Sequence, residues 1–387
     1  MKSRTYLVPL RRSLGALLMG VACLALHAPG AHAAIDLLER PARQSPLAAT
    51  STMLTVARAG ERLVAAGERG IVIYSDDRGV TWKQATVPVS VTLTSLFFVS
   101  PQTGWAAGHD GVILTTGDGG ASWQRQFDGR AGNRIVLQDL QARVEAARIA
   151  VDRADAATRE AAGAALEAWT ASLDDATAGA EFGPSRPLLG LWFRSAAEGL
   201  AVGAFGQVFH TADGGKSWTS RGGRIGNSEG YHYNAITALA DGSLMIAGEA
   251  GKLRRSRDGG ETWETLDTGY AGHLYGVLGL SGSRLLAFGF AGNALRSDDG
   301  GKTWQALPRL TAKALVGGSL LADGRVVLVA ADRTLLISDD QGRSFTVKAG
   351  ASGRPVAGVL PGPLQENRLL VVGAGGPAVL NLDSTTR

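Results

Sequence analysis

Short apolar stretches separated by glycine-rich turns recur along most of this chain. Between residues 96 and 126, for example, apolar runs begin at Leu96, Trp105 and Val112, and glycine lies in the turns between them. Runs of this kind bounded by glycine predict β-strands joined by hairpins. The pattern therefore predicts an all-β fold built from short antiparallel strands.

One turn in each repeat carries the same motif, Ser/Thr-x-Asp-x-Gly-x-Ser/Thr-Trp. The aspartates of its six copies are separated by 41, 95, 45, 41 and 41 residues. Repeats of this length are typical of propellers and solenoids. The aspartate and aromatic residues of the six copies are Asp77 and Trp82, Asp118 and Trp123, Asp213 and Trp218, Asp258 and Trp263, Asp299 and Trp304, and Asp340 with Phe345.

The chemistry of this motif favours a structural role. An aspartate before a glycine turn accepts hydrogen bonds from nearby backbone N–H groups, and glycine tolerates the positive φ of the turn. The tryptophan is large enough to fill the space between neighbouring sheets. A calcium loop would need a bidentate glutamate and more ligands, which the motif lacks.

A second motif, Gly-x-x-Gly after a small apolar pair, recurs in step with the first. It occurs at residues 67–70, 108–111, 203–206, 248–251 and 289–292, decays near residue 330, and returns at 373–376 without a following Asp motif. The two motifs together predict seven repeats, of which the last stops short. We expect Ile35 to Leu38 to supply the missing outer strand of the seventh repeat, because an open ring would expose strand edges.

The interval of 95 residues contains an inserted segment, residues 129–184. Apolar residues at helical spacing, from Leu137 to Val151 and from Ala162 to Leu173, predict two antiparallel helices that turn near Asp155. The apolar stripe of this hairpin either packs on the propeller or docks a partner. The predicted organisation is a signal peptide at 1–33, blades 1 and 2 at 34–128, the hairpin at 129–184, and blades 3 to 7 at 185–387.

The first 33 residues have the features of an export signal. Four basic residues precede an apolar run that ends in Ala31-His32-Ala33, a small-residue cleavage site. We predict a periplasmic protein without a transmembrane segment in the mature chain. Two alternatives stay open: Arg11-Arg12 fits a twin-arginine route, and Cys23 could carry a lipid anchor.

Removing this signal changes the charge balance. The whole chain has 39 Lys and Arg against 35 Asp and Glu, and all four excess cations lie in the signal. A nucleic-acid partner would require a basic footprint that this balance does not provide. The single cysteine is also in the signal, so the mature chain has no disulfide and no thiol chemistry.

These motifs resemble the Asp-box (BNR) repeat, and with Trp-Ala-x-Gly-x-x-Gly at residues 105–111 they are similar to one family of seven-bladed propellers. That family includes the photosystem II assembly factors and their bacterial relatives. The resemblance implies a seven-bladed propeller. Together with the hairpin predicted from helical spacing, the expected fold is an all-β, seven-bladed β-propeller with an inserted α-helical hairpin. The resemblance also implies a non-enzymatic scaffold or assembly factor for a membrane-associated complex, and relatives in other bacteria point to envelope transport systems.

Sialidases also carry Asp boxes, and they represent the competing class of function. That family implies an arginine triad and a Phe/Tyr-Arg-Ile-Pro motif, but here Arg134-Ile135 is followed by Val136. We therefore predict no catalytic residue, no cofactor and no metal site. A glycan-binding or glycoside-hydrolysing propeller stays open as the alternative, because paired carboxylates can lie far apart in a chain.

Strand alternation places the Gly-x-x-Gly turns on the same face as the connections between blades, opposite the Asp boxes. His232 and His273 are 41 residues apart, so they hold equivalent positions at the mouth of the central channel. We expect a monomer that binds a membrane-associated protein through this face. The predicted binding residues are Arg69, His109, Asp110, Tyr231, His232, Tyr233, Glu249, His273 and Tyr275.

Overall fold

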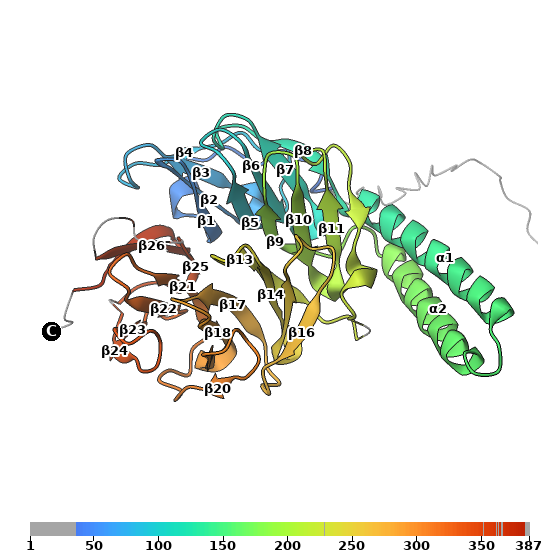
Figure 1. Ribbon diagram of the computed structural model, residues 1–387. Helices are drawn as coiled ribbons and strands as arrows, with labels where there is room; N and C mark the ends of the chain where they lie inside the picture. Colours follow the sequence, from blue (N-terminus) through green and yellow to red (C-terminus); the bar gives the residue numbers. More distant parts are fainter. Residues whose placement is uncertain are drawn as a thin grey trace, which may run out of the picture. The chain divides into compact units, whose positions relative to one another are not determined.

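The computed structural model describes residues 36–227, 229–350, 352–360, 362, 364 and 367–383. These residues form seven antiparallel sheets, six with four strands and one with three. Figure 1 shows the sheets arranged around a common axis, with two helices outside the ring. The prediction of a seven-bladed β-propeller with an inserted α-helical hairpin is confirmed. The predicted signal, with Cys23, lies outside the described residues.

Each blade is a simple up-and-down meander in chain order. Blades 1 to 3 contain β1 (Met53–Ala59), β2 (Arg62–Gly67), β3 (Val72–Ser75) and β4 (Lys83–Gln84); β5 (Leu93–Phe98), β6 (Gly104–Gly108), β7 (Ile113–Thr116) and β8 (Gln124–Phe127); and β9 (Leu188–Phe193), β10 (Gly199–Gly203), β11 (Val208–Thr211) and β12 (Thr219–Ser220). Blades 4 to 7 contain β13 (Tyr233–Ala238), β14 (Leu244–Gly248), β15 (Lys252–Ser256) and β16 (Glu264–Asp267); β17 (Leu274–Gly279), β18 (Leu285–Gly289), β19 (Ala294–Ser297) and β20 (Gln305–Ala306); β21 (Leu315–Leu320), β22 (Val326–Ala330), β23 (Leu335–Ser338) and β24 (Thr346–Lys348); and β25 (Val356–Val359), β26 (Arg368–Gly373) and β27 (Gly376–Asn381).

Seven short 3₁₀ turns connect or flank the strands of the described residues. They are η1 (Ala48–Thr50), η2 (Glu68–Gly70), η3 (His109–Gly111), η4 (Ala204–Gly206), η5 (Gly222–Arg224), η6 (Glu249–Gly251) and η7 (Phe290–Gly292). Five of them, η2, η3, η4, η6 and η7, join the second and third strands of blades 1 to 5. They therefore coincide with the Gly-x-x-Gly motifs of the sequence.

The hydrophobic core lies between neighbouring blades, because each second strand is covered on both faces. All five residues of β6, β10, β14, β18 and β22 are buried. Between blades 2 and 3, the rings of Trp105 and Phe193 stack with centroids 3.6 Å apart. This two-sided burial explains why these strands are apolar throughout rather than alternating.

The Asp boxes lie in the turns between the third and fourth strands, and their polar groups bond within the turn. In the first box, Asp77 accepts hydrogen bonds from the hydroxyl of Ser75 (2.8 Å) and the backbone N–H of Thr81 (2.8 Å). The indole N–H groups of Trp82, Trp123, Trp263 and Trp304 each donate to the carbonyl of the box glycine at 3.0–3.1 Å. The boxes thus stabilise their own turns. They lie on the face opposite the one that the sequence predicts for binding.

The prediction that Ile35 to Leu38 adds a fourth strand to blade 7 is wrong for residues 36–38; Ile35 is outside the described residues. Blade 7 has three strands in the described part of the chain. Leu38 is instead buried in the core between blades 1 and 2, together with Val87 and Trp123. The ring closes by side-chain packing, since Met53 and Val56 of β1 share a core with Leu370 and Val372 of β26.

The hairpin consists of α1 (Gly129–Arg153) and α2 (Arg159–Glu181). The side chain of Asp128 caps α1 by accepting the N–H groups of Arg130 and Ala131. The hairpin turns at Asp155, as the sequence predicts, and the Asp155 side chain there accepts the backbone N–H of Thr158. At its base, α1 packs against the core of blades 2 and 3 through Ile135 and Val136.

Candidate functional site on the inter-blade loop face

The turns η2, η3, η4, η6 and η7 and the connections between blades share one face, which we call the loop face. A Cβ built on Gly70 of η2 would lie 2.1 Å from the carbonyl oxygen of Val89, in the connection from blade 1 to blade 2. A Cβ on Gly251 of η6 would lie 1.7 Å from the carbonyl oxygen of Tyr270, in the connection from blade 4 to blade 5. Glycine ends these turns because the following connection passes directly over them.

The second residue of each such turn has a left-handed backbone although it is not glycine. The residues concerned are Arg69, Asp110, Phe205, Ala250, Ala291 and, in blade 6, Arg333, with φ between 53° and 74°. A bulky residue in this region is strained and is found where the surroundings enforce it. Phe205 is the clearest case, since its side chain is also 55% exposed.

Glu249 lies close to two of the predicted histidines, His232 and His273, which directly precede β13 and β17. Its Oε1 atom lies 3.8 Å from Nδ1 of His232 and 3.4 Å from Nδ1 of His273. Its Oε2 atom accepts the backbone N–H of His232 at 2.8 Å. The carboxylate is therefore held by the backbone just before β13 of blade 4 and reaches the residue that precedes β17 of blade 5.

Two exposed phenylalanines flank this carboxylate. The ring centroid of Phe205 lies 4.8 Å from that of His232, and Phe290 is 6.2 Å from His273 in an edge-to-face arrangement. Phe290 is 51% exposed, close to the exposure of Phe205. We call these five residues, Phe205, His232, Glu249, His273 and Phe290, the histidine–phenylalanine cluster.

The structure disperses the other predicted binding residues. Arg69 and the pair His109 and Asp110 lie on η2 and η3 of blades 1 and 2, away from the cluster on blades 3 to 5. The hydroxyl-bearing ring of Tyr233 is only 3% exposed and belongs to the core of blades 3 and 4, so its prediction as a binding residue is wrong. Tyr231 precedes β13, and its backbone is fixed by the side chain of Asn227.

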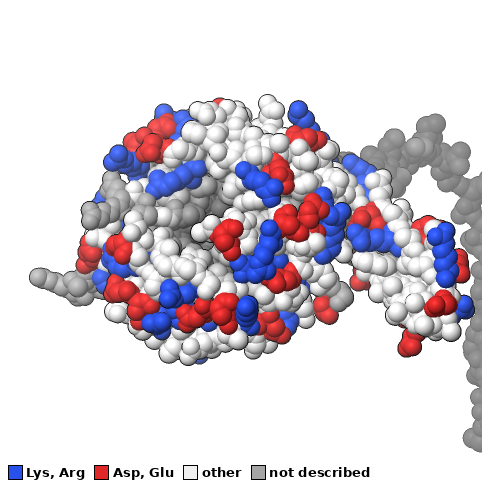
Figure 2. Space-filling view, viewed as in Figure 1, with Lys and Arg blue, Asp and Glu red and all other residues white. Residues whose placement is uncertain are grey.

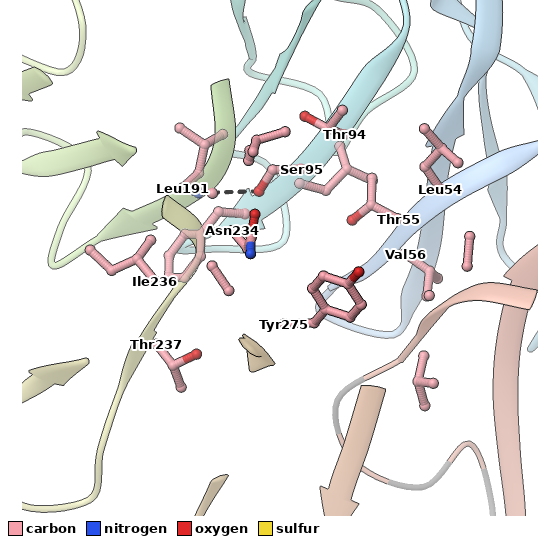
Figure 3. Close-up of a pocket in the computed structure, with 18 of the residues that line it drawn as sticks. Leu54, Thr55, Val56, Thr94, Ser95, Leu191, Asn234, Ile236, Thr237 and Tyr275 are labelled. Carbon is pink, nitrogen blue, oxygen red and sulfur yellow. Dashed lines mark hydrogen bonds between the residues drawn. The ribbon is translucent and has the colours of Figure 1, made fainter. Parts of the chain in front are cut away.

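Tyr275 faces the central channel, a cavity of about 830 Å³ lined by the seven first strands. A bulge near the start of each first strand aims one residue into it. Figure 3 shows Leu54, Thr94, Asn234 and Tyr275 among these residues. The seven are Leu54, Thr94, Leu189, Asn234, Tyr275, Val316 and Ala357.

The channel lining is uncharged: its described residues include no Arg, Lys, Asp or Glu. Its polar groups partly serve the frame, since Thr94 donates to the carbonyl of Leu188 (2.6 Å) and Asn234 to that of Leu274 (3.0 Å). Charged side chains of both signs surround the central hollow instead, as Figure 2 shows. The charged chemistry of this molecule is therefore at the rim and not inside the ring.

A second cavity, of about 550 Å³, lies between the hairpin and blade 3; we call it the hairpin groove. Trp169 and Asp175 of α2 line one side, and Phe205 with the connection from blade 3 to blade 4 lines the other. Arg186 lies at this groove with its guanidinium 5.0 Å from the ring centroid of Phe205. Phe205 belongs to both the groove and the cluster, so the two form one continuous surface. Nothing in the sequence marks Asp175, which lies in the insertion, or Arg186, which follows it, because neither belongs to a repeated motif.

Within the described ranges, no three or more His, Cys, Asp or Glu side chains are arranged to hold a metal ion, and this includes the two histidines around Glu249. Neither α1 nor α2, nor any other helix in the described part of the chain, has the length and apolar character of a membrane span. The groups that the cluster offers are two aromatic rings, two imidazoles and one carboxylate.

Fold and motifs together define a seven-bladed propeller of the Asp-box type. The BNR/Asp-box repeat family matches residues 73–84, and the photosynthesis system II assembly factor YCF48 family matches residues 181–332. The Photosystem II assembly protein Ycf48 of Synechococcus sp. (strain JA-2-3B'a(2-13)) is 25% identical over 188 residues, 48% of this chain. That match covers 40% of the Synechococcus protein, less than half of its length.

Solved structures show the same fold. YCF48 bound to a D1 peptide has a TM-score of 0.58 and 17% identity, covering 88% of this chain and 96% of that one. YCF48 from Cyanidioschyzon merolae has a TM-score of 0.57 and 12% identity, covering 88% and 98%. The resemblance is confirmed: the chain is similar to the Ycf48 family over residues 181–332, and it shares the propeller fold of the solved Ycf48 structures.

Proposed function

We propose that this chain is an exported, non-enzymatic accessory or assembly factor that binds a protein partner of a membrane-associated complex. An envelope transport system is the class of complex to test first, because the family resemblance implies it. The binding surface is the histidine–phenylalanine cluster with the adjoining hairpin groove. Export rests on the signal pattern of residues 1–33.

The observation that carries this proposal is the pair of half-exposed phenylalanines on either side of the His232–Glu249–His273 contacts. Aromatic residues are enriched in protein interfaces, where they contribute much of the binding energy. The Phe205 backbone, with φ of 56°, keeps its ring at the surface at a conformational cost. A solved propeller of the same fold is bound to a D1 peptide, which supports a peptide-binding role for this architecture.

A sialidase-like or other glycosidase activity has less support. The described lining of the channel contains no carboxylate and no arginine, whereas glycoside hydrolysis uses a pair of carboxylates. Glu249 at the rim already contacts two histidines and a backbone N–H. A fluorogenic glycosidase panel and a glycan array test this alternative directly.

The binding proposal is tested by crosslinking in the native envelope followed by mass spectrometry. A photo-reactive side chain at position 290 should capture a discrete partner. The same group at Val80, which is 80% exposed within the first Asp box on the opposite face, is the matched control. Equal capture of the same protein from both positions would contradict the proposal.

A second arm removes the aromatic ring without harming the fold. Phe205→Gly should relieve backbone strain, because glycine accepts a positive φ without steric cost. We expect the variant to be at least as stable as the parent, and to capture the partner at least about tenfold less, the loss typical of an interface hot spot. Unchanged capture would remove Phe205 from the surface.

A further inference from the structure

The hairpin groove is a built site rather than a gap between two loosely joined parts. Arg143 of α1 lies 4.9 Å from the ring centroid of Trp169 and donates to the carboxylate of Asp139 at 3.0 Å. A Cβ on Gly223 would lie 2.5 Å from the Arg143 guanidinium carbon, so this arginine also rests against the connection between blades 3 and 4. Arg143 thus fixes the two walls of the groove relative to each other.

The walls offer an apolar path. Val136 and Leu140 of α1 and Ala168 and Ala176 of α2 line the groove on the hairpin side. Val208 lines it from blade 3. An extended aliphatic stem can therefore be covered along the groove, as lysine and arginine stems are on apolar surfaces.

The charges of the groove leave carboxylates in excess. Asp139 is neutralised by Arg143, but Asp175 and Glu229 have no such pairing in the hydrogen bonds and ion pairs of the described residues. Arg186 is the only cation among the described residues that line the groove. Burial lowers the pKa of Arg186, with the Asp175 carboxylate acting in the opposite direction.

The same sign continues past Phe205 into the histidine–phenylalanine cluster. Glu249 is the acidic centre there, and the two imidazoles beside it lie 3.4 and 3.8 Å from its Oε1 atom. The carboxylates of the groove and of the cluster therefore lie on one continuous surface that includes Phe205.

We infer that the hairpin groove binds a lysine or arginine side chain of a basic segment of the partner protein. The stem of that side chain lies along the apolar walls, and its charged end lies against Asp175 and Glu229. The flanking residues of the segment pass over Phe205 toward Glu249. This inference rests on the proposed function and adds to it the chemical class of the partner segment.

The test uses the mature full chain and two fluorescein-labelled nonapeptides. One alternates lysine with phenylalanine, and the other alternates glutamate with phenylalanine. Binding is measured by fluorescence anisotropy, and we expect the lysine peptide to bind more tightly, with an affinity that falls as salt screens the charges.

A matched pair of variants locates the site. Asp175→Asn should weaken binding of the lysine peptide about tenfold, the usual effect of losing one charge-assisted contact. Asp174→Asn makes the same change of charge on the neighbouring residue of α2, which does not line the groove. It should leave the affinity within about twofold, because a surface charge outside the contact contributes little.

Equal binding of the two peptides, or equal effects of the two variants, would overturn the inference. These outcomes are separate from failure of the proposed function. If position 290 still captures the native partner while Asp175→Asn has no effect, the function stands and the basic segment is wrong. Loss of all capture from position 290 would instead count against the function.

Discussion

At the scale of single residues, the Asp boxes are self-contained. In each box, one carboxylate accepts a backbone N–H and a hydroxyl from the residue four positions later, as Asp258 does from Thr262 at 2.9 and 2.5 Å. These bonds, led by the hydroxyl of Thr262, lower the pKa of Asp258 from its ordinary 3.8 to about 2. Thr81 and Ser217 likewise lower the pKa of Asp77 and Asp213 to about 2.

This lowering predicts the response of the fold to acid. The folded box binds its proton less readily than the unfolded chain, so its stabilising contribution is complete above an unfolded pKa near 3.8. It should be lost as the pH falls from about 4 toward 2. We expect the urea midpoint to change little between about pH 7 and pH 5 and to drop steeply below about pH 4.

A pair of adjacent aspartates provides the control for this prediction. The two carboxylate oxygens of Asp340 accept hydrogen bonds from the backbone N–H and the hydroxyl of Ser344, and these bonds lower the pKa of Asp340. Asp339 makes no hydrogen bond in the box. Asp340→Asn should therefore lower the urea midpoint at neutral pH, and the gap from the parent should narrow in acid. Asp339→Asn should follow the parent at every pH; a matching loss in that variant would contradict the box explanation.

The sequence predicts these residues well because their chemistry is local. The box aspartates, the tryptophans and the spacing of His232 and His273 can all be recognised from fixed offsets along the chain. Tyr233 was misassigned, because the residue that opens a first strand can face the core or the channel. It is the next residue, Asn234, that the bulge directs inward.

At the scale of elements, the hairpin and the N-terminal segment show opposite limits of prediction. The hairpin was predictable because alanine-rich helical periodicity is a property of the segment itself. The position of residues 36–44 could not be predicted, because a mostly polar segment with two adjacent leucines fits a gap between any two blades. Its backbone bonds to the connection after blade 1, where Ala42 donates to Val87 and Ser90 donates to Leu37.

Only the base of the hairpin contacts the ring, which gives an element-scale prediction. The variant replaces residues 148–164 with a short Gly-Ser turn and keeps the residues at the base, Ile135, Val136, Arg143 and Trp169. The thermal midpoint of the propeller should stay within about 2 °C of the parent, because the removed part has few buried side chains. Binding at the hairpin groove should persist.

The corresponding control removes residues 133–179, including the base. That deletion uncovers Phe127 and Phe209 in the core of blades 2 and 3. It should lower the thermal midpoint and abolish partner capture while circular dichroism still reports a β-fold. If removing the tip costs as much stability as removing the base, the account of the hairpin contacts is wrong.

At the scale of the whole molecule, the ring is held by packing across its seams. Blades 7 and 1 meet through the shared core of Met53, Val56, Leu370 and Val372. The interface between blades 1 and 2 has additional contacts, because the N-terminal segment, residues 36–44, packs across it. Arg125 donates to the carbonyl of Leu38 and to Glu39, and Arg130 pairs with Asp36 and Glu39 at the start of α1.

Leu38 anchors these contacts, with 1% of its side chain exposed. Leu38→Ala should lower the free energy of unfolding by about 2–5 kcal/mol, the cost of removing a buried leucine side chain. Leu37 beside it is 42% exposed, and Leu37→Ala should change stability by no more than about 0.5 kcal/mol. Equal midpoints of the two variants in urea would show that the segment does not hold the seam.

The left-handed position in the turns of the loop face has a consequence for how such proteins diversify. Six blades present arginine, aspartate, phenylalanine or alanine from one backbone conformation. The conformation is set by the turn and by the connection above it, so exchanging the side chain leaves the strands unchanged. Substitutions at this position can therefore change the side chains around the rim one blade at a time. Homologues with superimposable rings can therefore acquire unrelated ligands, and likeness of the ring alone is a poor guide to what each one binds.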